Sequence, residues 1–234
     1  MNRIIFFVLL FTFISNYFIY SDDVYKKSVK GYLDLSKLDF EKSNLIYLDG
    51  EWELYYDKLL TPLDFDTKKI TPDGFIVMPN SWDSVIVDNK KLPWFGKATF
   101  KINLKLPINE NNRYALIFPV VNSAMKIWIN NNNCFNVGKI ADTKEQMTPL
   151  HKTVIIPFEI KDPNVTIVLN VSNFHIKSGG FWKSIKIGYY EKIKSTQTSF
   201  IAYKFFIFGA LLLIGFYHFV IFFFRTKNKA PLFF

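Results

Sequence analysis

The chain contains one cysteine among its 234 residues, so no disulfide bond can form within it. Cys134 follows a run of asparagines, where a free thiol is more often incidental than reactive, and we assign it no role. A domain exported from the cell would therefore be held together by its hydrophobic core alone.

Histidine is also scarce, and the usual catalytic motifs are missing. His151, His175 and His218 are too far apart for a sequence-local metal motif. There is no glycine-rich phosphate loop and no G-x-S-x-G nucleophile turn. Carboxylates such as Asp49 and Glu51 are plentiful, and a glycosidase needs two of them about 5–10 Å apart. We expect no cofactor and no enzymatic activity, with a hydrolase as the weakest functional hypothesis.

The chain lacks a dense basic stretch, although its formal net charge is +9. Residues 22–199 carry 24 of the 29 lysines and arginines and all 20 acidic residues, which leaves a net charge of +4. The other five basic residues lie in or beside two hydrophobic segments: Arg3, Lys204, Arg225, Lys227 and Lys229. Without a clustered basic face, a nucleic-acid partner is not expected.

The first hydrophobic segment, residues 1–21, is typical of a secretory signal peptide. Arg3 precedes an apolar run that ends at Ser21 and two aspartates. Cleavage after Ser21 would place a small residue before the cut bond. If the segment is not cleaved, it serves as a signal anchor.

The second segment, residues 204–224, predicts a transmembrane helix. Residues 205–224 include no Asp, Glu, Lys or Arg, and at about 1.5 Å per residue they just span a hydrocarbon core of about 30 Å. Basic residues are more frequent after this segment than before it. The positive-inside rule therefore places residues 225–234 in the cytoplasm and residues 22–203 outside.

Between the two segments, residues 22–199 predict an all-β domain. Apolar residues alternate with polar ones over 98–106, 125–129 and 165–171, which indicates half-buried strands. Short strands separated by Pro, Gly and Asn turns favour an antiparallel β-sandwich or jelly roll. Residues 57–65 predict at most one helical turn, and residues 191–200 form a stalk that leads into the membrane.

The sequence NVSNFHIKSGGFWKSIKIG, residues 170–188, raises the main question about function. Gly179 and Gly180 could supply a backbone geometry that other residues resist while the next two aromatic residues fill a core. Alternatively, aromatic and amide side chains at the lip of a loop form a platform for a small molecule.

We take Trp82, Asn173, His175 and Trp182 as the candidate ligand-binding residues. The alternatives are a buried position for Trp82 and, for Asn173 and His175, satisfied polar groups that brace the Gly-Gly turn. Within this set we expect Trp182 to turn into the sandwich, behind a tight Gly-Gly turn that no side chain can fill, and the other three to edge a ligand-facing rim. Strict alternation would instead bury Phe181 beside Ile185 and Ile187, so the expectation for Trp182 requires a β-bulge after the glycines.

The remaining tryptophans also divide into core and surface candidates. Trp52, in the strand-like sequence GEWELYY, is expected in the core. Trp94 and Trp128 could each line an interface. His218 and Tyr217 lie inside the predicted membrane helix, where polar groups favour contact with other protein over lipid.

Six segments occur in an order that resembles the N-terminal part of the bacterial seven-transmembrane receptors with diverse intracellular signalling modules. They are LDLSKLDFEKSNLIYLDGEWELYYDKLLTPLDF, VMPNSWDS, GKATFKINLKLP, ALIFPVVNSAMKIWINN, VSNFHIKSGGFWKSIKIG and GALLLIGFYHFVIFFFRTKNKAPLFF. The outer part is also similar to the galactose-binding-like jelly roll of glycoside hydrolase family 2.

The resemblance implies a sensory domain in the bacterial inner membrane, with its bulk outside the cytoplasm and with a carbohydrate or another small molecule as ligand. Its further partners would be more transmembrane helices and a signalling output domain. The apolar sequence APLFF looks like the beginning of a second helix, which favours a fragment of such a receptor. The alternative is a stand-alone carbohydrate-binding module with one membrane anchor.

Overall fold

The computed structural model describes seven ranges of the chain and divides it into two compact units, which meet between residues 190 and 191 and are described separately below. The predicted signal peptide, residues 1–21, and the predicted cytoplasmic segment, residues 225–234, lie outside the described residues. The described ranges are 24–43, 45–87, 89–110, 112–121, 123–131, 133–177 and 179–224.

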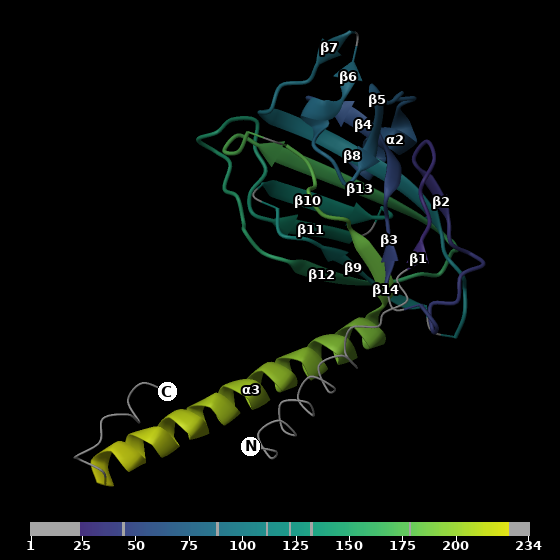
Figure 1. Cartoon of the computed structure of the whole chain (residues 1–234). Coiled ribbons are helices and arrows are strands. Elements are labelled where there is room, and N and C mark those ends of the chain that lie inside the picture. The colour runs from purple at the N-terminus through teal and green to yellow at the C-terminus, as the bar shows by residue number, and fades with distance from the viewer. Residues whose placement is uncertain are drawn as a thin grey trace. The chain divides into compact units, whose positions relative to one another are not determined.

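The first unit is built from two main β-sheets (Figure 1). The smaller one has five strands, whose neighbours are antiparallel except for the parallel pair β1 and β3. In spatial order they are β1 (Val24–Tyr25), β3 (Ile46–Tyr47), β14 (Lys186–Tyr189), β9 (Arg113–Phe118) and β12 (Val154–Glu159).

The larger sheet has seven strands, and β2 (Tyr32–Asp34) joins it as a parallel neighbour of β8. Its other strands are, in spatial order, β11 (Asn133–Val137), β10 (Ala124–Ile129), β13 (Asn164–Asn173), β8 (Gly96–Lys105), β4 (Gly50–Tyr56) and β5 (Gly74–Met78). A separate hairpin pairs β6 (Ile86–Val87) with β7 (Lys90–Lys91).

Both sheets contribute to one hydrophobic core, and the residues predicted to face inward are buried, although much of the opposite face of β13, including Val168 and Asn170, is buried as well. On β8, the side chains of Ala98, Phe100, Ile102 and Leu104 are at most 1 % exposed. Trp52 of β4 is fully buried as well, as expected. On β10 and β13, the inward residues are likewise at most 1 % exposed: Met125, Ile127, Ile129, Val165, Ile167, Leu169 and Val171. Since each such side chain contributes roughly 1.5–3 kcal/mol, these strands dominate the stability of the domain.

The helical parts of the first unit are short. The helix α2 (Pro62–Thr67) begins with Thr61 as its N-cap, whose backbone N–H and hydroxyl both donate to the Asp64 carboxylate, and the 3-10 helix η1 covers Trp82–Ser84. The unit is therefore mostly β-sheet with antiparallel pairing, in agreement with the sequence, whereas the jelly-roll type stays a prediction.

The described part of the second unit belongs to one apolar helix, α3 (Tyr190–Phe224), whose first residue is the last of the first unit and which begins directly after β14. It includes the predicted membrane segment 204–224, and the predicted stalk, residues 191–200, forms its first turns. It is the one helix in the described ranges that is long and apolar enough to cross a membrane.

Residues 22–199 expressed without either hydrophobic segment should fold as a monomeric β-protein, because the core lies between the two sheets. Circular dichroism should show mainly β-structure. Thermal unfolding should be the same with and without a reducing agent, because Cys134 has no second cysteine to pair with. A mainly helical spectrum, or a midpoint that falls on reduction, would contradict this expectation.

Candidate functional site

The two glycines of the 170–188 segment lie against Trp82. A Cβ atom on Gly179 would be only 2.0 Å from Cζ2 of the Trp82 ring, so the indole occupies the space that any side chain would need. Gly180 has a positive φ of +129°, and a Cβ there would lie 2.5 Å from the carbonyl oxygen of Asn80. The prediction that no side chain fits here is confirmed. The segment is not a simple turn, because Gly180 forms an antiparallel bridge with Ser81.

Backbone and hydroxyl groups fasten the two segments to each other. The carbonyl oxygen of Gly179 accepts from the backbone N–H of Trp82 and from the hydroxyl of Ser81, each over 2.7 Å. The N–H of Phe181 donates to the carbonyl of Asn80 over 3.1 Å. Residues about a hundred positions apart in sequence are thus joined by three hydrogen bonds beside the indole.

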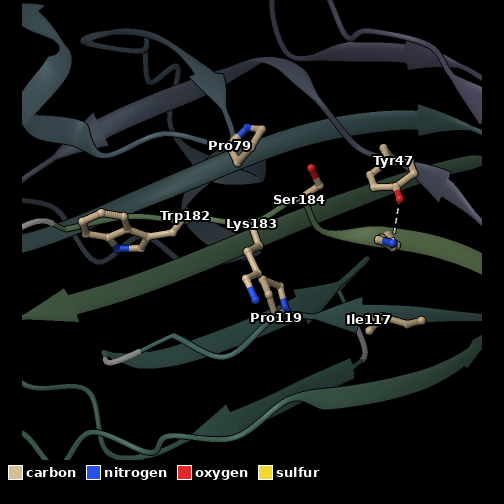
Figure 2. Close-up of a pocket in the computed structure, with 8 residues that line it drawn as sticks. Tyr47, Pro79, Ile117, Pro119, Trp182, Lys183 and Ser184 are labelled. Atoms are coloured by element: carbon tan, nitrogen blue, oxygen red, sulfur yellow. Dashed lines mark hydrogen bonds between the residues drawn. The ribbon is translucent and has the colours of Figure 1, made fainter.

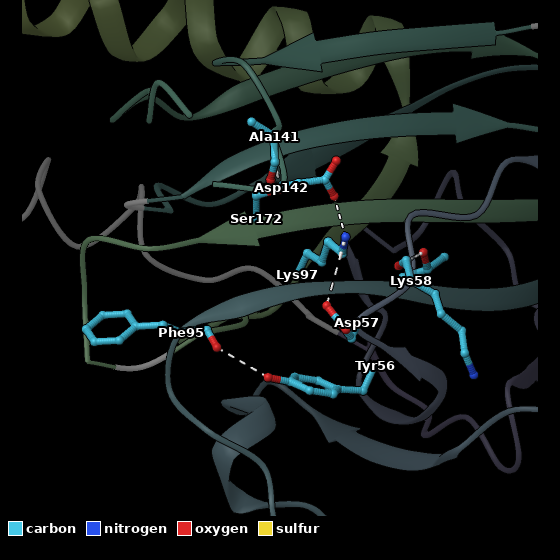
Figure 3. Close-up of polar contacts among 9 residues, drawn as sticks. Tyr56, Asp57, Lys58, Phe95, Lys97, Ala141, Asp142 and Ser172 are labelled. Atoms are coloured by element: carbon cyan, nitrogen blue, oxygen red, sulfur yellow. Dashed lines mark hydrogen bonds and ion pairs between the residues drawn. The ribbon is translucent and has the colours of Figure 1, made fainter. Parts of the chain in front are cut away.

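Three consecutive carbonyl groups of the 93–95 loop are held by side chains. Trp82 Nε1 donates to Pro93 O over 2.9 Å, and Asn173 Nδ2 donates to the carbonyl of residue 94 over 3.0 Å. The hydroxyl of Tyr56 donates to the carbonyl of Phe95 over 3.2 Å (Figure 3). Burial raises the pKa of the Tyr56 hydroxyl, which keeps it a donor. The backbone of this loop is therefore held in place by hydrogen bonds from three side chains.

A neighbouring loop is attached by ion pairs and by a serine, as Figure 3 shows. The ammonium group of Lys97 on β8 pairs with the carboxylate of Asp142 and lies 3.9 Å from that of Asp57. The hydroxyl of Ser172 donates to the carbonyl of Ala141 over 2.9 Å. These contacts join the chain after β11 to β8 and β13.

The expected positions of two candidate residues at a rim are wrong. Trp82 is fully buried, and its ring stacks on Phe100 with centroids 6.2 Å apart. Asn173 is also fully buried, and its side chain bonds to the carbonyls of residues 94 and 176. Both side chains are internal supports, because each has its polar group satisfied by backbone carbonyls inside the domain.

The expected inward position of Trp182 is wrong as well. Trp182 is 66 % exposed, whereas Phe181 is 1 % exposed and joins Ile185 and Ile187 in the core. Phe181, Ile185 and Ile187 keep one parity, so no bulge is needed to bury Phe181, although Lys183 has the same parity and is exposed at a bend before β14. His175 is exposed, as a rim residue would be.

An open cavity of about 360 Å³ lies beside Trp182. Trp182 and Tyr47 lie at its two ends in Figure 2, with Pro79 between them on one side and Pro119 on the other. The lining residues are Tyr47, Pro79, Ile117, Pro119, Trp182, Lys183, Ser184 and Lys186. We refer to this cavity as the Trp182 pocket. Its volume is near the lower end of the range of about 300–1,000 Å³ that is typical of small-molecule sites.

The polar groups of the Trp182 pocket are mainly cationic. Lys186 Nζ donates to the Tyr47 hydroxyl over 2.8 Å and lies 4.2 Å from the centroid of the same ring. Lys183 is exposed, and neither lysine forms an ion pair within the described ranges. No Asp or Glu lines the pocket. The arrangement can therefore bind a ligand by ring contacts and positive charge.

One carboxylate follows β3 in the chain without lining the pocket. The N–H of Leu48 donates to the carbonyl of Ile185 over 2.9 Å, and the next residue, Asp49, accepts at its backbone carbonyl from the N–H of Ser28 over 2.8 Å. Asp49 Oδ1 is buried and has no hydrogen-bond partner in the described structure. A buried acceptor without a partner is unfavourable, and such groups are often found near functional sites.

Of the four candidate residues, only Trp182 lines the pocket, and the seven other lining residues were not predicted. They come from β3, β9, β14 and the segments around residues 79 and 119, so no local spacing reveals them. One signal was available in the sequence: Trp182, Ser184 and Lys186 occupy every second position of their segment, which places them together on its outward face. Within the described ranges, no group of three or more His, Cys, Asp or Glu side chains could hold a metal ion.

Comparison with known proteins identifies only distant structural matches. No protein-family model and no curated protein matches the chain. Among solved structures, two β-glucuronidase structures from Ruminococcus gnavus match with TM-scores of 0.43 and 0.44 at 16 % and 14 % identity. A β-glucuronidase from an uncultured Clostridium sp. matches with a TM-score of 0.44 at 14 % identity.

Each of these matches covers 61 % of this chain and only 27–28 % of the other. This chain thus corresponds to little more than a quarter of the length of those proteins. A likeness at this level supports neither an activity nor a ligand for this chain.

Replacing the two tryptophans should have opposite effects on stability. Trp82→Ala should lower the free energy of unfolding by about 3–5 kcal/mol, because it empties a buried site and leaves the carbonyl of Pro93 unpaired. Trp182→Ala should change it by no more than about 0.5 kcal/mol, because the indole is mostly exposed. Urea unfolding of residues 22–199 measures both. Equal losses for the two variants would contradict the structure.

Gly179→Ala should destabilise the same fragment by about 1–3 kcal/mol or more, because the new methyl group would overlap the Trp82 ring. Gly74→Ala is the matched control: a Cβ there meets nothing closer than 3.9 Å. That variant should unfold like the parent or slightly later, because alanine is favoured over glycine in a strand. If both variants unfold like the parent, the indole does not lie against Gly179.

Proposed function

We propose that this chain is the extracytoplasmic ligand-binding domain of a bacterial transmembrane signalling receptor, with a jelly-roll fold and with α3 as its first membrane helix. The observation that carries the proposal is the place of the Trp182 pocket in the chain. Lys186 belongs to β14, and Trp182 and Ser184 directly precede that strand. No loop residue separates β14 from α3.

The pocket also contacts the strands on both sides of β14. Tyr47 is the last residue of β3, and Ile117 belongs to β9, and these are the two hydrogen-bonded neighbours of β14. A ligand that touches all three strands would stabilise one arrangement of β14 relative to its neighbours over others. Such a preference would be passed on to the helix as a shift between states.

The lining of the pocket favours binding over catalysis. Its polar side chains are two lysines, one serine and one tyrosine, and the rest is apolar or aromatic. Glycoside hydrolysis uses a pair of carboxylates, and no Asp or Glu lines the pocket. We therefore favour a receptor domain over a hydrolase. Its partners would be the inner membrane, further membrane helices and a signalling output domain.

One observation favours a second candidate, a carbohydrate-binding module tethered to the membrane. Trp94 and Phe95 are 45 % and 43 % exposed, and the loop that carries them is held by the three carbonyl contacts described above. Aromatic side chains on a fixed loop can stack on a sugar ring. Trp128 does not contribute to such a surface, because it is only 7 % exposed.

The receptor proposal requires that residues 22–203 lie outside the cytoplasmic membrane and that the chain after Phe224 lies inside. Intact spheroplasts treated with an external protease should lose the β-domain, while a tag added after Phe234 should survive until the membrane is permeabilised. The permeabilised sample is the control for cleavage of the tag. A protected β-domain with a digested tag would overturn the proposal.

A further inference from the structure

We propose that the Trp182 pocket binds a small anion whose acidic group is carried on a ring. The inference rests on the proposed function, because it takes this pocket as the ligand site and adds the charge and shape of the ligand. It follows from the balance of charges at the pocket and from the placement of its rings.

The charge comes from Lys183 and Lys186. An ammonium group has three donors, and Lys186 uses one of them for the Tyr47 hydroxyl. The other two donors remain for a ligand at the same wall. Lys183 makes no hydrogen bond or ion pair with any described residue. With no Asp or Glu in the lining, nothing within the pocket neutralises the two cations.

The shape follows from the apolar part of the lining. Trp182 and Tyr47 supply aromatic rings at the two ends, and Pro79, Ile117 and Pro119 supply the apolar surface between them. Rings stack favourably on such surfaces, whereas a flexible chain would lose more conformational freedom on binding. The volume of about 360 Å³ limits the ligand to a small molecule of one or two rings.

The two lysines should contribute unequally. Lys186 is half-buried and already oriented by Tyr47, so a charge-assisted hydrogen bond from it should be strong. Lys183 is exposed, and ion pairs in such positions contribute little. We expect Lys186→Gln to weaken binding about tenfold, and Lys183→Gln to weaken it about threefold or less.

The test uses the full chain in nanodiscs and matched pairs of charged and neutral probes, with binding measured by calorimetry. The pairs are benzoate against benzamide and galacturonate against galactose. At least one acid should bind saturably below about 10 mM, at least tenfold more tightly than its neutral partner and more weakly at higher salt. Inorganic phosphate, which has charge but no ring, should bind more weakly than the preferred acid.

Substitutions test whether the acid binds in the Trp182 pocket. Lys186→Arg should retain it, because the positive charge and its donors remain, whereas Lys186→Gln and Trp182→Ala should weaken it. Lys161→Gln is the control, because this exposed lysine follows β12 at the far end of the β9–β12 ladder, away from Ile117. A far-ultraviolet spectrum and an unchanged melting midpoint must accompany each weakened variant.

The inference is overturned if no acid binds below about 10 mM, if a neutral probe binds as tightly as its acid, or if Lys186→Gln binds like the parent. These outcomes differ from failure of the receptor proposal. Acid binding that depends on Lys186, found together with an inverted membrane topology, would keep the anion site and exclude the receptor. Tight binding of galactose that is lost in Trp94→Ala but not in Trp182→Ala would instead support the second candidate.

Discussion

The contact of the Trp82 indole with Gly179 is the constraint on which this end of the β-domain depends. The ring fills the space that a side chain at 179 would take, and the backbone on either side of the contact is joined by hydrogen bonds to Gly179 O and Asn80 O. The indole N–H then reaches the carbonyl of Pro93. One side chain thus links the segments after β5, before β8 and before β14.

The same contact explains why the aromatic pair after the glycines is split between core and surface. Gly180 is bridged to Ser81, so the direction of the chain is set when it reaches Phe181, which then lies on the same side as Ile185 and Ile187. Phe181 packs against Phe100 and Phe118 in the core, with ring centroids 6.1 and 6.5 Å away. Trp182 must then point outward, where it becomes one end of the pocket.

Periodicity was sufficient to predict the inward residues of the three strands β8, β10 and β13 but not the site. The alternation on β8, β10 and β13 placed their buried residues correctly, because a two-residue repeat depends only on neighbours in the chain. Trp82 was misplaced because it lies in the polar sequence PNSWDS, where no period indicates burial. Its partner, Gly179, is distant in sequence, and so are the segments that form the pocket. The error for Trp182 came from assuming a bulge where the alternation needed none.

Several features that do not stabilise the fold meet around Ser184. Trp182 exposes most of a large apolar ring, and two lysines lie near it without a carboxylate partner. Asp49, which follows the Leu48–Ile185 hydrogen bond in the chain, keeps a buried side-chain oxygen without a hydrogen bond. The other buried side-chain polar atoms of the described domain are paired, as for Asn173 and Thr99. Since local rules of packing and pairing are most often broken at functional sites, these features together favour ligand binding at this wall over a structural role.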